Sequence, residues 1–422
     1  MIGLLASLQA PDHWRWIPFG GACERRKDIG RADLQPLSVF LDGGVVPRAD
    51  RAEDNHNRLG ADLDKYLAVR PGDIVFNKLR TWQGGFGHAR NEGIVSPAYF
   101  VCRPHDAEPR YLDYALHSQP YLQELTRISK WMPPSQFDIA WGDLKRLPLL
   151  LPPAVQQRRI ADFLDAETAR IDALIDTKQQ MHAVLFDTRR EVTFTGVAGL
   201  VTAGHDRRGS SLPWVADLPS NWGEAKLTLL ARLGSGHTPS RSRPEWWVDR
   251  TIPWITTGEV SQMRTDRIET ISETREQISD LGVANSSAEV HPAGTVVLCR
   301  TASAGYSAIM AEPMATSQDF ATWTCGERLL PQFLLLCLRA MRSDLLGRLA
   351  MGSTHKTIYM PDIESIRIPV PPMKEQQQVV DAVWQRLGRI DAIVDTLTQQ
   401  IDLLRERRSA LITAVVSGEL VV

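Results

Sequence analysis

The side chains that could carry out catalysis in this sequence lack the partners that the chemistry requires. His237 and His355 stand without a second ligand at the spacing of a metal site. The glycines at 84–87 could cradle a phosphate, but turns explain them better, and the G-x-x-x-x-G-K-S/T loop of ATP-binding proteins is missing. The acidic residues around Lys374 invite comparison with a nuclease, yet they open a long predicted helix, where capping and solvation explain them. We therefore predict a non-catalytic chain without metal or cofactor.

Composition points to a globular protein of a reducing compartment. A length of 422 residues exceeds one ordinary core, so at least two domains are expected. The five cysteines are odd in number and form no C-x-x-C pair, which argues against disulfides and zinc and favours the cytoplasm. The longest apolar segment, 333–340, is too short to span a membrane, and the first residues lack the basic start of a signal peptide, so we expect no membrane partner. A formal net charge of −2 argues against an indiscriminate binder of polyanions but allows a local one.

A long internal repeat organises the chain. Residues 143–200 match 362–419 without a gap, at a constant offset of 219. The densest part is RIDALIDT (170–177) against RIDAIVDT (389–396), where six of eight residues are identical. Other identities include the two Pro-Pro pairs, Gln157/Gln376, Arg189/Arg408 and Gly199/Gly418.

Each copy of the repeat predicts one long helix that begins at its Pro-Pro pair, since proline fits the first helical turn. Apolar residues then recur at alternating spacings of four and three, which favours a coiled-coil pair within the chain over two unrelated surface helices. In the second copy Arg408 interrupts this seam, and in the first copy Glu167 and Lys178 dilute it. The seam residues are Ile160, Leu164, Ile171, Leu174, Met181 and Leu185 in the first copy and Ile390, Val394, Leu397, Ile401, Leu404, Leu411 and Val415 in the second.

Two segments of similar size surround the first copy and predict compact α+β domains. RPGDIVFNKLR (70–80) is similar to HPAGTVVLCR (291–300), each a turn, a β-branched strand and a basic residue. YLDYAL (111–116) parallels FLLLCL (333–338), each a short apolar helix. The order of domain, helix, domain, helix implies an internal pseudo-twofold symmetry, as in proteins that read two half-sites on duplex DNA.

The exits into the helices read WGDLKRLPLLLPPAVQQ (141–157) and MPDIESIRIPVPPMKEQ (360–376). Further motifs are LQPLSVFLDGGVVPR (34–48), GDIVFNKLRTWQGGFG (72–87) and SPAY (96–99), then GSGHTPS (234–240), IPWITTGEV (252–260), RTASAGYSAI (300–309), ATSQDF (315–320) and GSTHKTI (352–358). With these motifs the architecture resembles the specificity subunits of type I restriction-modification systems over nearly the whole chain. The motifs fall in the family's order, and the two exits approach its Pro-Pro and Glu-Gln signature, although Gln156 stands where Glu is favoured.

The resemblance implies two target-recognition domains, each reading one half of a split sequence in double-stranded DNA, separated by antiparallel helices. It also implies two methyltransferase subunits and, for cleavage, restriction/translocase subunits as partners. The corresponding boundaries are 1–142 and 212–361 for the two domains, 143–200 and 362–422 for the helical segments, and 201–211 for the linker.

Residues that could contact DNA are basic, amide and hydroxyl side chains on glycine-containing loops. Arg or Lys can bond guanine, and Asn or Gln adenine, in the major groove. Each could equally be a solvated loop residue or a phosphate contact. Tryptophans could also stack against DNA, but for Trp82, Trp131, Trp246 and Trp247 we expect burial instead. The candidates are Arg48, Lys78, Arg80, Gln83, Lys130 and Gln136 in the first domain and Thr238, Ser240, Arg300, Ser303, Gln318, Thr354 and Lys356 in the second.

Two alternative functions stay open. A self-contained restriction or modification enzyme would need the Asn/Asp-Pro-Pro-aromatic loop of DNA methyltransferases, and SPAY (96–99) lacks the amide and the second proline. A coiled-coil scaffold with two protein-binding domains would keep the helical repeat but would not need the loop motifs.

Overall fold

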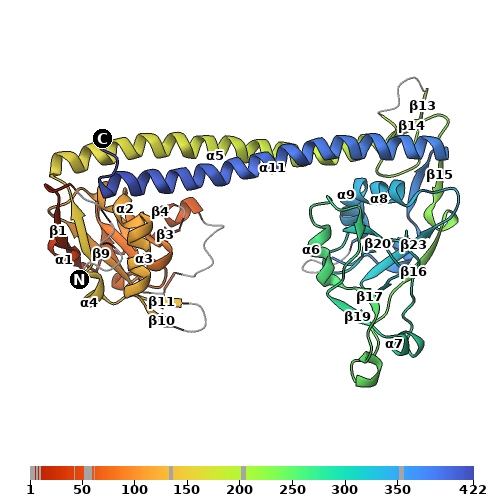
Figure 1. Ribbon diagram of the computed structural model, residues 1–422, viewed down its shortest axis with the longest axis horizontal. Helices are drawn as coiled ribbons and strands as arrows, with labels where there is room; N and C mark the ends of the chain where they lie inside the picture. Colours follow the sequence, from red (N-terminus) through yellow and green to blue (C-terminus); the bar gives the residue numbers. More distant parts are fainter. Residues whose placement is uncertain are drawn as a thin grey trace. The chain divides into compact units, whose positions relative to one another are not determined.

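The chain folds into two compact units that share two long helices. The computed structural model describes residues 5, 8, 11–41, 43–51, 59–60, 62–132, 136–200, 206–350 and 356–422, with residues 132 and 136 described by their backbone alone. Unit 1 comprises Met1–Lys178 and Gln399–Val422, and unit 2 comprises Gln179–Thr398. Helices α5 (Ala154–Val197) and α11 (Met373–Ser417) each contribute one part to unit 1 and the other part to unit 2 (Figure 1).

Unit 1 is built on an antiparallel four-stranded sheet with the order β2-β9-β6-β7. Helices α2 and α3 pack on this sheet, and their buried residues join the sheet's aromatic core around Phe76 and Phe86. A two-stranded ribbon, β1 with β12, leads into α5. The strands are β1 (Arg15–Pro18), β2 (Cys23–Arg26), β3 (Leu37–Phe40), β4 (Gly44–Pro47), β5 (Leu67–Val69), β6 (Ile74–Asn77), β7 (Phe86–His88), β8 (Gly93–Val95), β9 (Tyr99–Pro104), β10 (Lys130–Met132), β11 (Gln136–Asp138) and β12 (Pro148–Leu151), and the helices are α1 (Phe19–Ala22), α2 (Pro109–His117), α3 (Gln119–Ile128) and α4 (Trp141–Leu144).

Unit 2 repeats this plan with a larger sheet, of order β16-β23-β20-β21-β18, and a second one of order β19-β17-β22. Helix α8 is buried over most of its length against β20 and β21. The ribbon of β15 with β24 leads into α11 as β1 with β12 leads into α5. The strands are β13 (Arg207–Gly209), β14 (Asp217–Pro219), β15 (Gly223–Lys226), β16 (Ala231–Ser235), β17 (Ile252–Ile255), β18 (Thr270–Ile271), β19 (Glu276–Ile278), β20 (Val296–Cys299), β21 (Ser307–Met310), β22 (Ala315–Thr316), β23 (Phe320–Cys325) and β24 (Arg367–Val370), and the helices are α6 (Val260–Met263), α7 (Asp280–Ala284), α8 (Pro331–Ala340), α9 (Arg342–Asp344) and α10 (Met360–Glu364).

The predicted α+β class and the matched elements are confirmed. The paired strand motifs form β6 and β20, and the paired apolar motifs form α2 and α8. The long helices start directly after the two Pro-Pro pairs, as the sequence predicts.

Helices α5 and α11 are antiparallel where they meet in each unit. In unit 1, Ile171 and Ile175 contact Ile401. The prediction that Leu174 and Met181 belong to the apolar seam of the first copy was wrong, because these residues are 51% and 48% exposed. An α-helix turns once every 3.6 residues and drifts from a strict heptad, so the buried face passes to Ile175 instead of Leu174.

A glycine follows the end of each long helix and lies close to a proline of the same chain. Gly199 (φ +67°) and Gly418 (φ +82°) adopt the left-handed conformation that favours glycine. A Cβ at Gly199 would approach Pro219 to 2.5 Å, and one at Gly418 would approach Pro11 to 2.4 Å. The repeat therefore preserves glycine at both positions for conformation and for space.

A buried glutamine ties each long helix to its domain. Gln157 Nε2 donates to the Pro152 carbonyl (2.8 Å), and its Oε1 accepts from the backbone N–H of Glu108, just before α2 (2.8 Å). In unit 2, Gln376 makes the same two contacts, with the Pro371 carbonyl and with the N–H of Leu330 just before α8 (both 2.9 Å). These bonds satisfy polar groups that burial would otherwise leave unpaired.

Candidate nucleic-acid interface

Most of the predicted contact residues of unit 2 lie at one edge of its main sheet. Strands β16 and β20 both end at this edge, beside the start of the antiparallel strand β23. Three connections leave it: the loop 236–240, the loop 300–306 and the turn 317–319. These carry five of the candidates, namely Thr238, Ser240, Arg300, Ser303 and Gln318.

Two of these candidates touch each other. Thr238 Oγ1 donates a hydrogen bond to Gln318 Oε1 at 2.6 Å. Gln318 is exposed and Thr238 is half-buried, so the pair lies at the surface. Loop geometry brings together two residues that are 80 positions apart in the chain.

The Asp319 carboxylate fixes the turn that bears Gln318 to the neighbouring loop. It accepts hydrogen bonds from Thr301 Oγ1 (2.5 Å) and from Ser317 Oγ (3.1 Å). The Arg300 N–H donates to the Asp319 carbonyl at 2.8 Å. Ala302 has a φ of +55°, a strained conformation for a residue with a side chain, which the surrounding contacts must sustain.

The remaining candidates of unit 2 differ in their exposure and in their hydrogen bonds within the unit. Ser240 is exposed and its hydroxyl lies 2.8 Å from that of Ser242. Ser303 is half-buried within the 300–306 loop. Lys356 is exposed and donates one hydrogen bond to the Leu346 carbonyl (3.2 Å). Thr354 lies outside the described residues.

Unit 1 presents an equivalent edge. Strand β6 ends beside the start of β9, because Asn77 pairs with Tyr99. The connection from β6 to β7 carries three candidates: Lys78, Arg80 and Gln83. Arg80 and Gln83 are exposed. Lys78 Nζ lies 3.2 Å from Asp138 Oδ1, so its charge is partly committed within the unit.

Arg48 approaches the same edge from the end of β4. Burial raises the pKa of Tyr99, and the positive charges of Arg80 and Arg48 act in the opposite direction. Both positive charges thus act on this tyrosine at the start of β9.

The hairpin of β10 and β11 carries the last two candidates of unit 1. Lys130 is exposed at the start of β10, and Gln136 begins β11. Trp131, the residue after Lys130, is 49% exposed and packs edge-on against Phe137, with 4.8 Å between the ring centres. The prediction of burial was wrong for Trp131, whereas Trp82, Trp246 and Trp247 are partly buried.

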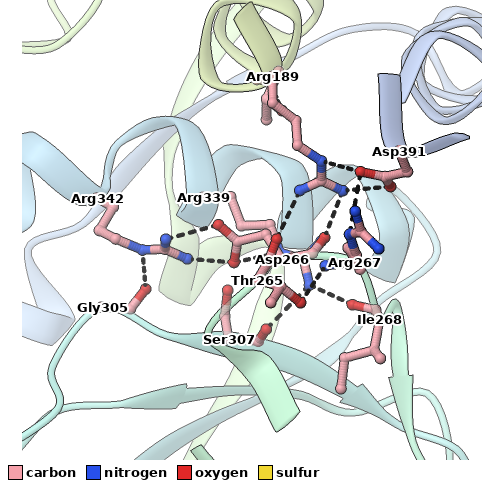
Figure 2. A network of polar contacts seen from close by, with 11 residues as sticks. Arg189, Thr265, Asp266, Arg267, Ile268, Gly305, Ser307, Arg339, Arg342 and Asp391 are labelled. Atoms are coloured by element: carbon pink, nitrogen blue, oxygen red, sulfur yellow. Dashed lines mark hydrogen bonds and ion pairs between the residues drawn. The ribbon is translucent and has the colours of Figure 1, made fainter. Parts of the chain in front are cut away.

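A network of arginines holds unit 2 to its part of the helix pair (Figure 2). Arg342 donates to both carboxylate oxygens of Asp266 (2.7 and 2.6 Å), and Arg339 donates to the Asp266 carbonyl (2.8 Å). Arg189 of α5 reaches the carbonyls of Thr265 and Asp266 and the carboxylate of Asp391 in α11. Burial lowers the pKa of Arg339 to about 10. These arginines are committed to the framework rather than to a ligand.

Sequence reasoning missed two features beside the unit 2 edge. One is the positioning carboxylate of Asp319. The other is Arg241, whose guanidinium lies 4.7 Å from the ring centre of Trp247 and forms an ion pair with Glu276 (2.9 Å). The signal that could have indicated this stacking is RSRPEWW (241–247), where two arginines, Arg241 and Arg243, precede two tryptophans.

Among the described residues, no group of three or more His, Cys, Asp or Glu side chains could hold a metal ion. None of the described helices combines the length and the apolar character needed to cross a membrane.

The comparisons with known proteins agree with this geometry. Residues 219–404 match the family of the type I restriction modification DNA specificity domain. The chain thus has the similarity to the specificity subunits of type I restriction-modification systems that its sequence predicts. Among curated members, it is 25% identical over 193 residues to the MjaIX specificity subunit of Methanocaldococcus jannaschii, covering 46% of this chain and 43% of that relative. It is also 25% identical over 224 residues to a type I restriction enzyme specificity subunit of Escherichia coli, covering 51% and 54%. The matches thus span about half the length of these relatives.

Two solved structures share the fold of this chain over nearly its whole length. The HsdS subunit from Thermoanaerobacter tengcongensis matches with a TM-score of 0.53 and 18% identity over 98% of this chain and 99% of that one. A chain from a study of complex assembly and conformational transition of the type I restriction-modification system matches with a TM-score of 0.68 and 18% identity over 98% and 100%.

Proposed function

We propose that this chain recognises a two-part sequence in double-stranded DNA, one part with each unit. In this proposal it directs two methyltransferase subunits, and restriction/translocase subunits for cleavage, to that sequence. The two reading domains are residues 1–142 and 212–361, and the segments 143–200 and 362–422 carry the helices. All five cysteines are free thiols, which supports work in the reducing cytoplasm.

The observation that carries the proposal is the equivalence of the two sheet edges. In unit 1 the loop after β6 bears Lys78, Arg80 and Gln83, and in unit 2 the loop after β20 bears Arg300 and Ser303. Guanidinium, ammonium and amide groups on short loops are the groups that read base edges and bind phosphates. A repeated edge of this kind supports a reader of two half-sites.

A domain exchange tests this function. Residues 212–361 would be replaced by the corresponding domain of another family member, and the variant would be expressed with its methyltransferase. Methylation mapping should then show one half of the target changed and the other half retained. Replacing residues 1–142 in a separate variant is the matched control and should change the other half. If either exchange alters both halves, the modular assignment is wrong.

The chain by itself should catalyse nothing. Calorimetry of the isolated chain should show no binding of S-adenosylmethionine, and DNA incubated with it should be neither methylated nor cut. Tight binding of the methyl donor by the isolated chain would favour a self-contained enzyme.

A further inference from the structure

The contact between Thr238 and Gln318 fixes which way an exposed amide group points. The threonine hydroxyl donates to Gln318 Oε1, so this oxygen is the end of the amide that faces Thr238. The oxygen keeps a second lone pair, and among the described residues nothing accepts a hydrogen bond from Nε2. An acceptor and a donor therefore remain side by side for a ligand.

The backbone beneath both side chains is also fixed. The His237 N–H donates to the Thr316 carbonyl (3.0 Å), which joins the Thr238 loop to the turn that bears Gln318. A Cβ at position 236 would lie 2.0 Å from the Thr316 carbonyl oxygen, so only glycine allows this approach. The Ser317 N–H donates to the Ile255 carbonyl (2.9 Å) and anchors the turn to β17.

Such an amide matches one base edge. In the major groove adenine offers the N6 amino group as donor and N7 as acceptor, which pair with the oxygen and the nitrogen of an amide. Guanine offers two acceptors there and cytosine a donor. Holding a glutamine in place before binding removes part of the entropy that ordering it on DNA would cost.

We propose that Gln318 reads an adenine in the half-site of unit 2 and that Thr238 is its positioning residue. The inference rests on the proposed function, since it names the base that the same surface recognises. Asp319 and Gly236 belong to the support of this reader and do not touch the base.

The experiment selects binding sites from a random DNA library with the complex assembled from this chain and its methyltransferase. The wild-type complex should select an adenine at a fixed position of one half-site. The Gln318→Ala variant should lose that preference by about tenfold or more, with the other positions unchanged. Gln318→Glu should move the preference at the same position to cytosine, because a carboxylate only accepts and cytosine N4 donates. Thr238→Val should weaken the preference at this position, and Thr238→Ser should restore it.

Matched controls separate the possible failures. Gln262→Ala removes another exposed glutamine of unit 2, one on α6 whose amide donates to the Glu273 carbonyl, and should leave the selected sequence intact. Melting temperatures of all variants check that unit 2 is folded. If Gln318→Ala and Gln318→Glu still select the wild-type sequence, or if affinity falls equally for all sequences, the adenine proposal is overturned while DNA recognition stands. If the wild-type complex selects no sequence at all, the proposed function itself fails.

Discussion

Arg189 of α5 and Asp391 of α11 form an ion pair that the sequence repeat reproduces at its other copy. Arg189 Nε lies 2.8 Å from Asp391 Oδ1 in unit 2, and Arg408 Nε lies 2.9 Å from Asp172 Oδ1 in unit 1. At the offset of 219, Arg189 corresponds to Arg408 and Asp391 to Asp172. The arginine that seemed to interrupt the apolar seam is therefore a repeated cross-link between the helices.

The two ion pairs should differ in energy because they differ in exposure. The side chains of Arg189 and Asp391 are 9% and 20% exposed, against 38% and 49% for Arg408 and Asp172. Arg189→Ala should destabilise unit 2 by about 3 kcal/mol, since it leaves a largely buried carboxylate with poorer compensation. Arg408→Ala should cost less than about 1 kcal/mol. Hydrogen exchange of each unit measures both effects, and Arg407→Ala at an exposed position is the control. Equal costs for both variants would contradict this ranking.

The buried glutamines should be essential for holding each domain to its helix. Gln376→Ala removes the acceptor for the Leu330 N–H and the donor for the Pro371 carbonyl, leaving buried polar groups unpaired at a cost of about 2–3 kcal/mol. Gln157→Ala should do the same in unit 1. We expect faster hydrogen exchange at the start of α8 in Gln376→Ala and at the start of α2 in Gln157→Ala. Gln399→Ala, at an exposed position of α11, should change neither. Unaltered exchange in both variants would show that these bonds contribute little.

Unit 1 should lose stability as the pH rises above neutrality. His117 Nδ1 lies 2.9 Å from Asp113 Oδ1, and His88 Nδ1 lies 2.6 Å from Asp113 Oδ2. Burial alone would lower the pKa of His117, but the Asp113 carboxylate and the hydrogen bonds raise it above its ordinary value. Burial likewise would raise the pKa of Asp113, but hydrogen bonds from His117 and His88 bring it well below its usual range.

These two pKa shifts determine how the stability of unit 1 changes with pH. The raised pKa of His117 contributes stability that is fully present below the unfolded value of about 6.5 and is lost as the pH rises through the folded value. The lowered pKa of Asp113 contributes stability present above about 3.9 and lost as the pH falls through its folded value. Unit 1 should therefore melt at a higher temperature at pH 6 than at pH 9. His117→Gln should reduce this difference and His105→Gln, at an exposed position, should preserve it. A pH response that His117→Gln leaves intact would assign the effect to other groups.

The helix pair should set the spacing between the two halves of the target. One heptad inserted after Gln180 and one after Gln399 would lengthen both helices at the same level of the pair by about 10 Å, or about three base pairs, while preserving the apolar seam. Sites selected by the assembled complex should keep both halves and gain a longer spacer. An insertion in one helix only is the control, and it should disrupt assembly because the registers no longer agree. Retained binding with the original spacer would limit the helices to docking the methyltransferases.

The elements that could be predicted from the sequence are those marked by the internal repeat or by residue type. The offset of 219 located both long helices, and the paired motifs located β6, β20, α2 and α8. Amide and hydroxyl chemistry singled out Gln318 and Thr238, but their mutual contact depends on how two loops 80 residues apart meet at a sheet edge. Asp319 could not be singled out, because a carboxylate on a loop is usually solvated. Its role arises from Thr301 and Ser317, which only the folded chain places around it.

The composition of unit 1 has a consequence for synthesis on the ribosome. Ile412, Val415 and Val416, near the end of α11, lie in the same buried cluster as the first domain's core residues. Unit 2, in contrast, is drawn from one continuous stretch, Gln179–Thr398. The domain that is translated first must therefore wait for the last turns of α11 before its core is complete, whereas the second needs no residue beyond Thr398. Although the two domains have similar folds, the one that leaves the ribosome first would thus be the last to complete its core.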